Sequence, residues 1–190
     1  MSRVDGEGRV ALVTGGNRGI GLEVARELAA RGMTVLLGCR DVEKGREAAR
    51  RLGPRVSGVA LDVTDGASVT ALVEAVEREH GRLDVLVNNA GVYLDEGVRG
   101  LDVDMETVGV TLETNTVGPL RLIQAFAPMM KRRGYGRIVN VTSGYGAMRA
   151  MASGGVLAYK LSKLALNGMT RVLAAELRGT GVLVNVVDPG

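Results

Sequence analysis

A tyrosine and a lysine four positions apart, Tyr159 and Lys163, are the residues of this 190-residue chain best suited to proton chemistry. On a helix, positions with this spacing project from one face, so the lysine ammonium can lie near the phenol. A free tyrosine has a pKa of about 10, and a neighbouring cation stabilises the phenolate and lowers that pKa. A Tyr-x-x-x-Lys pair alone is common by chance; where other residues support it, it indicates a tyrosine that exchanges a proton near neutral pH.

A glycine cluster near the N-terminus, T-G-G-N-R-G-I-G over residues 14–21, follows an apolar run at 10–13. The run predicts a strand, and the apolar periodicity that starts at Leu22 predicts a helix. Glycines at 15, 19 and 21 allow a tight turn and let a diphosphate approach the positive end of the helix dipole. A nucleoside-triphosphate loop is excluded because Leu22 follows Gly21, where that loop needs lysine. The stretch indicates a dinucleotide site, although a plain strand-to-helix connection also uses such glycines.

The elements that must position these residues alternate along the chain. We expect strands at 10–13, 34–38, 57–61, 83–87, 137–141 and 182–187, and helices from 22, at 41–52, after 62–65, at 105–132 and at 155–178. Strands that are apolar on both faces and separated by helices indicate a parallel sheet covered on both sides. The predicted fold is one α/β domain, doubly wound (Rossmann) and mostly parallel, which binds ligands at the carboxyl ends of its strands.

Composition narrows the class of protein. A hydrophobic content of 46% supports one sizeable core, and the net charge of +3, from interspersed charges, gives no basic face for nucleic acid. The single Cys39 excludes an internal disulfide, and the single His80 makes a His/Cys metal cluster implausible, so we expect no metal. No apolar run reaches membrane-spanning length, and we expect a soluble, cytoplasmic protein.

Further motifs stand where later strands end. The stretch 88–91, N-N-A-G, closes the strand 83–87; its two carboxamides can tie neighbouring strands together, and its small residues let a flat ring approach the backbone. Asp62 and Val63 close the strand before it, although Asp62 could equally be a helix N-cap. Ser143 follows the strand 137–141, and Asn115 lies in the expected helix 105–132.

The ordered set of motifs resembles the short-chain dehydrogenase/reductase family, nearest to its carbonyl-reductase-like, NADP(H)-dependent members. The glycine loop matches the family's T-G-x-x-x-G-x-G cofactor loop, and N-N-A-G is a hallmark of the family. The resemblance implies a catalytic set in which each member has a role. Ser143 would polarise the substrate oxygen, Tyr159 would donate the proton, Lys163 would hold the nicotinamide ribose and lower the tyrosine pKa, and Asn115 would position a proton-relaying water.

The end of the second predicted strand bears on the choice of cofactor. In dinucleotide-binding folds an acidic side chain near this point binds the adenosine ribose hydroxyls, whereas an arginine can pair with a 2′-phosphate. Arg40 matches the family's NADP-preferring pattern, and Arg18 is a second cation of the kind that such members carry. Both could also be ordinary solvated charges, with Asp41 partly neutralising Arg40. We expect NADP(H).

The resemblance also implies which residues hold the cofactor. This set consists of Gly15, Asn17, Arg18, Gly19, Ile20, Gly21, Arg40, Asp62, Val63, Asn89, Ala90, Gly91, Tyr159, Lys163, Pro189 and Gly190. The activity implied is hydride transfer between NADP(H) and a small-molecule carbonyl or secondary alcohol. Two alternatives stay open: a non-catalytic NADP-binding protein, and a truncated fragment of the same fold.

Family members normally continue past the Pro-Gly turn into a substrate-covering loop, one or two helices and a seventh strand. We therefore expect the domain at 1–190 to be C-terminally incomplete, without a substrate lid and with the strand 182–187 as an exposed sheet edge. The Gly-, Ala- and Met-rich segment 143–159 is expected to form a lip over the substrate. The long helices 105–132 and 155–178 resemble the pair through which many members form a homodimer.

Overall fold

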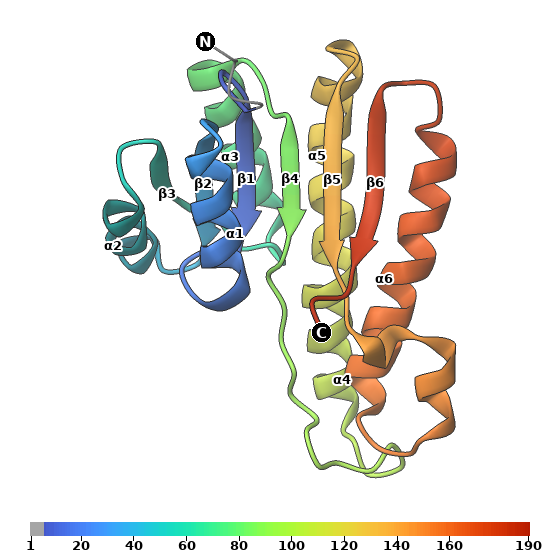
Figure 1. Ribbon diagram of the computed structural model, residues 1–190. Coiled ribbons are helices and arrows are strands. Elements are labelled where there is room, and N and C mark those ends of the chain that lie inside the picture. The colour runs from blue at the N-terminus through green and yellow to red at the C-terminus, as the bar shows by residue number, and fades with distance from the viewer. Residues whose placement is uncertain (1–5) are drawn as a thin grey trace.

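A computed structural model describes residues 6–190 (Figure 1). Six strands are formed: β1 (Val10–Thr14), β2 (Thr34–Cys39), β3 (Val56–Ala60), β4 (Val85–Asn88), β5 (Gly136–Val141) and β6 (Val182–Val187). The helices are α1 (Gly19–Ala30), α2 (Val42–Leu52), α3 (Gly66–His80), α4 (Met105–Leu112), the π-helix η1 (Glu113–Val117), α5 (Gly118–Arg132), the 3₁₀ turns η2 (Gly144–Gly146) and η3 (Met148–Ala152), and α6 (Leu157–Glu176).

The strands form one sheet in the order β3-β2-β1-β4-β5-β6, and all neighbouring pairs are parallel. The chain runs outward from β1 to β3 and then returns to place β4 on the other side of β1. The carboxyl ends of all six strands consequently lie at the same end of the sheet, the lower end in Figure 1. The order reverses between β1 and β4, which is where a doubly wound sheet opens a ligand crevice. The predicted fold class is confirmed.

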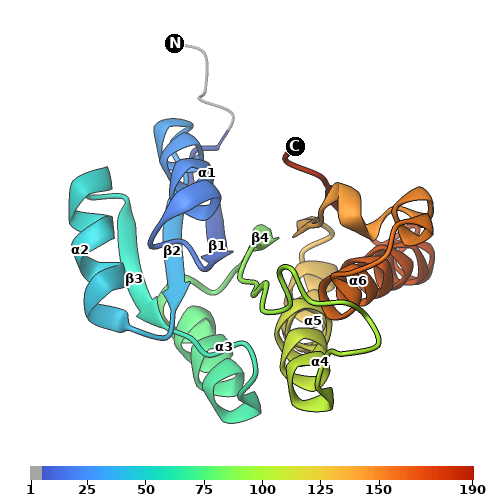
Figure 2. The ribbon, with the colours of Figure 1, turned by 90° about the horizontal axis from the view of Figure 1, so that it is seen from below.

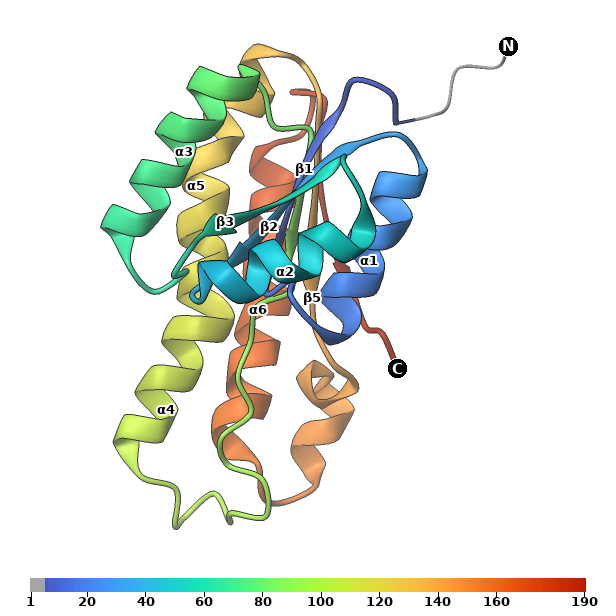
Figure 3. The same ribbon diagram turned by 90° about the vertical axis from the view of Figure 1, so that its left-hand side faces the viewer.

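Helices cover both faces of the sheet. Helices α1 and α2 lie on one face, and α3, α5 and α6 lie on the other, as the two turned views show (Figures 2 and 3). Side chains of β1 alternate accordingly: Val10 and Leu12 pack into the core under α3 and α5, whereas Ala11 and Val13 pack into the core under α1 and α2. Burial on both faces explains the continuous apolar runs.

The long helices differ in detail from the expectation. The helix expected at 105–132 contains the π-helix η1, so α4 and α5 are joined by a wider turn. Helix α6 begins at Leu157 rather than at 155, because Gly155 and Val156 have positive φ angles of 77° and 54° that no α-helix accepts. Helix α1 begins at Gly19, three residues before the apolar periodicity.

Two element ends and one edge bear on the site. Strand β3 spans Val56–Ala60 rather than 57–61, and β4 spans Val85–Asn88 rather than 83–87. The N-cap of α3 is Asp65, whose carboxylate accepts a hydrogen bond from Ala67 N, so the N-cap role considered for Asp62 was wrong. Strand β6 forms an edge of the described sheet, as expected.

Within residues 6–190, none of the helices combines the length and apolar character of a membrane span.

Candidate active site

A cavity of about 500 Å³ lies at the carboxyl ends of β1, β2 and β4. Predicted cofactor-binding residues that line it are Gly15, Asn17, Arg18, Gly19, Ile20, Arg40, Asp62, Val63, Asn89, Ala90 and Gly91. The sequence prediction missed Gly38, Cys39, Leu61, Thr64, Val92 and Thr114, which also line it. Each of these residues lies within two positions of a predicted residue. Closeness in the sequence to the predicted set could therefore have indicated that they line the cavity. The lining does not include Gly21, Tyr159, Lys163, Pro189 or Gly190.

The glycine loop shapes the floor of this cavity. Gly15 and Gly19 have φ angles of 63° and 57°, which glycine adopts without strain. Gly21 lies beneath the loop: a Cβ there would stand 2.5 Å from Asn89 Nδ2 and 2.7 Å from Gly15 O. Its role is therefore close packing that lets α1 approach the loop, rather than contact with a ligand.

The N-N-A-G stretch fastens the loop to the sheet. Asn89 Nδ2 donates to the carbonyls of Thr14 and Gly15, at 2.9 and 3.2 Å. Thr14 Oγ1 in turn accepts from the backbone N–H groups of Asn89 and Ala90, at 3.0 and 2.9 Å. Asn88 Nδ2 donates to Asn140 Oδ1 of β5 at 2.8 Å. The two carboxamides thus tie β4 to both of its neighbours, as predicted.

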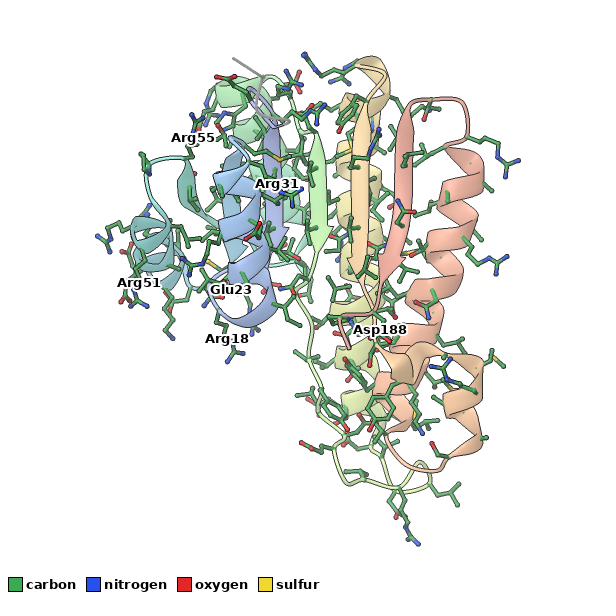
Figure 4. The ribbon with its side chains drawn as sticks, viewed as in Figure 1. Arg18, Glu23, Arg31, Arg51, Arg55 and Asp188 are labelled. Carbon is green, nitrogen blue, oxygen red and sulfur yellow. The ribbon has the colours of Figure 1, made fainter. Side chains whose placement is uncertain are left out.

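The arginines expected to bind phosphate are available to do so. Among residues 6–190, neither Arg18 nor Arg40 forms an ion pair with a carboxylate, and Figure 4 shows Arg18 projecting below the sheet from the glycine loop. Asp41 is engaged elsewhere: it caps α2 through Lys44 N at 3.1 Å and pairs with Lys44 Nζ at 3.2 Å. Hydrogen bonds from Thr64 chiefly, and the charge of Arg40 to a lesser degree, lower the pKa of Asp62.

The expected catalytic residues converge beside the cavity. Lys163 Nζ lies 5.6 Å from the centroid of the Tyr159 ring, one helical turn away on α6, and donates to Val141 O at 2.8 Å. Ser143 lies close enough to the Tyr159 side chain to influence its pKa. Gly91 joins this group to the cavity, because a Cβ there would lie 3.2 Å from Asn115 Oδ1 and 3.8 Å from Lys163 Nζ.

Burial controls the pKa of both titratable groups. Burial raises the pKa of Tyr159; the nearby Ser143 side chain opposes the rise, and the charge of Asp188 and the neighbouring Tyr145 add to it. Burial also lowers the pKa of Lys163 to about 8. The rise is opposite in direction to the sequence expectation for this tyrosine, because desolvation is the largest influence on its pKa. The effect expected of Lys163 on the Tyr159 pKa stays a prediction.

Asn115 lies in the π-helix, where its side chain reaches two other segments. Its Oδ1 accepts from Val92 N, and its Nδ2 donates to Val92 O, both at 2.8 Å, and to Ser162 Oγ at 3.0 Å. The amide therefore clamps the cavity wall at Val92 to α6. Both hydrogens of the Asn115 side-chain amide are donated to protein groups, Val92 O and Ser162 Oγ. The side chain therefore has no free hydrogen with which to bind the expected water.

The turn at Pro189 and Gly190 follows β6 and is exposed. Thr142 N donates to Val187 O at 2.9 Å, and a Cβ on Gly144 would stand 3.4 Å from Asp188 Oδ2. The end of β6 therefore lies beside the segment that carries Ser143, in agreement with Figure 4, where Asp188 lies below the carboxyl end of β6.

Asp95 is a site residue that the sequence reasoning missed. Its carboxylate is fully buried and accepts from the backbone of Ala158 at 2.7 Å and of Tyr159 at 3.4 Å. Val156, the N-cap of α6, makes no capping hydrogen bond with its side chain, so Asp95 provides the cap from 61 positions earlier in the chain. A buried negative charge at a helix N-terminus also complements the helix dipole. The only sequence feature that could have indicated this role is the position of Asp95, four residues after the N-N-A-G stretch.

Comparison with known proteins places this geometry in a family. The sequence model described as "short chain dehydrogenase" matches residues 9–190. The 3-oxoacyl-(acyl-carrier-protein) reductase FabG of Escherichia coli K12 is 39% identical over 186 residues, covering 97% of this chain and 73% of that protein. The monensin polyketide synthase putative ketoacyl reductase of Streptomyces virginiae is 43% identical over 187 residues, covering 96% and 70%.

Solved structures agree with the sequence relatives. A metagenomic short-chain oxidoreductase in complex with NADP superposes with a TM-score of 0.87 at 37% identity, covering 97% of this chain and 83% of that one. A short-chain dehydrogenase from Streptomyces avermitilis gives a TM-score of 0.89 at 33% identity, covering 100% and 67%. The chain therefore belongs to the short-chain dehydrogenase family.

Proposed function

We propose that the protein is an NADP(H)-dependent oxidoreductase that interconverts a small-molecule carbonyl and a secondary alcohol. The observation that carries this proposal is the continuity between the glycine-loop cavity and the Ser143, Tyr159 and Lys163 group, which meet at Gly91. Relatives named as ketoacyl reductases, and a similar structure in complex with NADP, support it. A non-catalytic binding protein would need the cavity but not all three side chains.

The residues present fit NADP(H). Gly15 and Gly19 line the cavity, and a Cβ on Gly19 would enter space that no protein atom fills within 4 Å. The start of α1 would direct its backbone N–H groups toward a diphosphate bound there. Arg40 and Arg18 would bind the 2′-phosphate, since neither has a carboxylate partner within the described chain. When bound, the reduced cofactor supplies hydride to the carbonyl carbon.

The chain's own groups supply and direct the proton. Tyr159, whose phenol is protonated at neutral pH, donates its proton to the carbonyl oxygen, so that hydride plus proton gives the alcohol. Ser143 donates a hydrogen bond to the same oxygen and stabilises its developing charge. Lys163 faces Gly91 and would bind the nicotinamide ribose, whereas Asn115 and Asp95 are positioning residues.

The proposal extends to the substrate class and the assembly of the enzyme. The printed functions of the relatives make 3-oxoacyl compounds the first substrates to test. We propose a cytoplasmic homodimer without nucleic-acid or membrane partners. An exposed stripe on α6 with helical spacing supports the dimer; it consists of Leu161, Ala165, Gly168 and Val172.

Removing the hydroxyl of Tyr159 tests the proposal. We expect Tyr159→Phe to lower kcat by roughly 10²–10⁴-fold, because positioned proton transfer is lost, while the NADPH dissociation constant changes little. Tyr135→Phe is the matched control, because Tyr135 lies between Arg9 and Arg137, away from Tyr159. NADPH oxidation with a panel of ketones, aldehydes and 3-oxoacyl thioesters is the assay. Reduction by Tyr159→Phe at the parent rate would contradict the assignment.

A further inference from the structure

Aromatic residues are scarce in this chain, yet most of them gather at one place. The sequence has four tyrosines, one phenylalanine and no tryptophan. Phe126 is buried in the core. Three of the four tyrosines contact one another beside the reaction point: Tyr93, Tyr145 and Tyr159. Only Tyr159 has a role in the proposed mechanism, so the other two rings require an explanation.

The two additional rings flank the proton donor in different orientations. The centroid of the Tyr93 ring lies 4.6 Å from that of Tyr159, with the planes tilted by 35°. The Tyr145 ring lies 6.1 Å from Tyr159 at an interplanar angle of 80°, an edge-to-face contact. Tyr93 and Tyr145 are themselves 6.4 Å apart. Tyr145 thus meets Tyr159 edge to face, which is one of the geometries that aromatic pairs prefer, and Tyr93 meets it at a tilt.

Both rings keep a free surface. Tyr93 is 38% exposed and Tyr145 is 42% exposed, so neither is a core residue. Tyr93 follows Val92, which lines the cofactor cavity, and Tyr145 N donates to Ser143 Oγ at 3.3 Å. Each ring therefore projects from a segment that also carries a residue of the active site.

Neighbouring contacts hold the rings in place. Lys160 Nζ lies 5.8 Å from the centroid of the Tyr145 ring and is itself fixed by Ser153 O at 2.7 Å. Burial chiefly, and the neighbouring Tyr145 to a lesser degree, raise the pKa of Tyr93. Fixed aromatic side chains bind with little loss of conformational entropy.

We propose that Tyr93 and Tyr145 form an aromatic wall that selects carbonyl substrates carrying a planar aromatic ring close to the carbonyl group. This inference rests on the proposed reductase function and names its substrate class. A flat ring packed on this wall would gain contacts that a puckered saturated ring of similar size does not make. From the strength of aromatic pairs, each wall residue should favour the aromatic substrate about two- to tenfold.

A matched pair of ketones isolates this effect. Phenylacetone and cyclohexylacetone differ in the ring, which one methylene separates from the carbonyl, so conjugation does not alter the reactivity of the carbonyl. We expect the wild type to show the higher kcat/KM for phenylacetone. Tyr93→Leu and Tyr145→Leu should each lower the phenyl-to-cyclohexyl ratio of kcat/KM about two- to tenfold. Tyr93→Phe, which keeps the ring, and Tyr135→Leu, at the remote tyrosine, should keep the wild-type ratio.

The outcomes separate this inference from the proposed function. An unchanged ratio in both leucine variants, or an equal loss in Tyr135→Leu, would overturn the aromatic wall while leaving the reductase intact. If the wild type oxidises no NADPH with either ketone or with any other carbonyl compound of the panel, the reductase proposal fails, and ligand-observed NMR then tests the wall directly. In that measurement, made with NADP⁺ present, saturation transfer to phenylacetone that Tyr93→Leu does not reduce would overturn it.

Discussion

At the scale of single residues, Lys163 carries a charge in a buried position, and this gives stability a pH dependence. Its pKa is about 8 in the folded chain against an ordinary value of 10.5. Between these values the unfolded chain binds more protons, so the free energy of unfolding rises with pH. Relative to Lys163→Met, we expect the wild type to gain about 2 kcal/mol between pH 7.5 and 9.5.

Urea denaturation of both proteins at the two pH values measures this change. The penalty for burying the ammonium is fully present below about pH 8 and is relieved as the pH rises through that value. Using the difference between the two proteins removes the contribution of other titrating groups. A difference that stays constant with pH would show that Lys163 is not buried as a cation.

The second prediction at the scale of single residues concerns Arg40 and the affinity for NADPH. Arg40→Asp replaces the partner of the 2′-phosphate by a like charge, and losing such a charged pair costs about 1.5–3 kcal/mol. We expect NADPH to bind roughly 10–150-fold more weakly, while NADH binding changes far less. Arg31→Asp is the control, with the same change in charge at the opposite end of α1 from Arg18 (Figure 4). A wild type that prefers NADH would remove Arg40 from this role.

At the scale of elements, one buried carboxylate connects the cavity to the catalytic helix. Asp95 binds the N-terminus of α6 one turn before Lys163, and Tyr159 N is one of its two donors. In Asp95→Asn, the side-chain oxygen can still accept a hydrogen bond from one of these two backbone N–H groups. The side-chain NH₂ group then faces the other N–H group, from which it cannot accept a hydrogen bond. We expect kcat to fall roughly tenfold, because a small displacement of Tyr159 is costly, while NADPH affinity stays unchanged.

Asp84 offers a control for this substitution at the amino end of the sheet. It is equally buried, accepts from Val10 N at 2.8 Å and pairs with Arg82. Asp84→Asn should lower the melting temperature without a selective loss of kcat. If the two variants lose kcat in proportion to their loss of stability, Asp95 is a structural residue and not a positioning one.

Local signals account for the parts of the fold and site that the sequence could predict. Apolar runs, helix periodicity and glycines with positive φ act within a few residues, and they predicted β1, the glycine loop and α6 to within a few positions. The contact of Asp95 with Ala158 spans 63 positions, and the contacts of the Asn115 side chain with Val92 and Ser162 span 23 and 47 positions. Such pairings arise only when the sheet brings distant segments together, as does the burial that sets the pKa of Tyr159.

At the scale of the whole molecule, two exposed apolar surfaces of the described residues are candidate sites of association. One is the α6 stripe, where Val172 is 57% exposed, and the other is the edge strand β6, where Leu183 is 53% exposed. A helix stripe of small and apolar residues favours a closed symmetric contact, whereas an open strand edge favours unlimited pairing. The two surfaces therefore predict different assemblies, a defined dimer or a growing aggregate.

Placing a charge on each surface in turn decides between them. If α6 forms the dimer, Val172→Asp should shift the protein to a monomer at micromolar concentration, since an aspartate in the contact would be buried without a partner. Leu183→Asp should leave the dimer intact and reduce slow aggregation, because a charge on an edge strand opposes strand pairing. Multi-angle light scattering of both variants over a range of concentrations gives the masses. Dissociation by Leu183→Asp but not by Val172→Asp would assign the contact to β6 and refute the helix-mediated dimer.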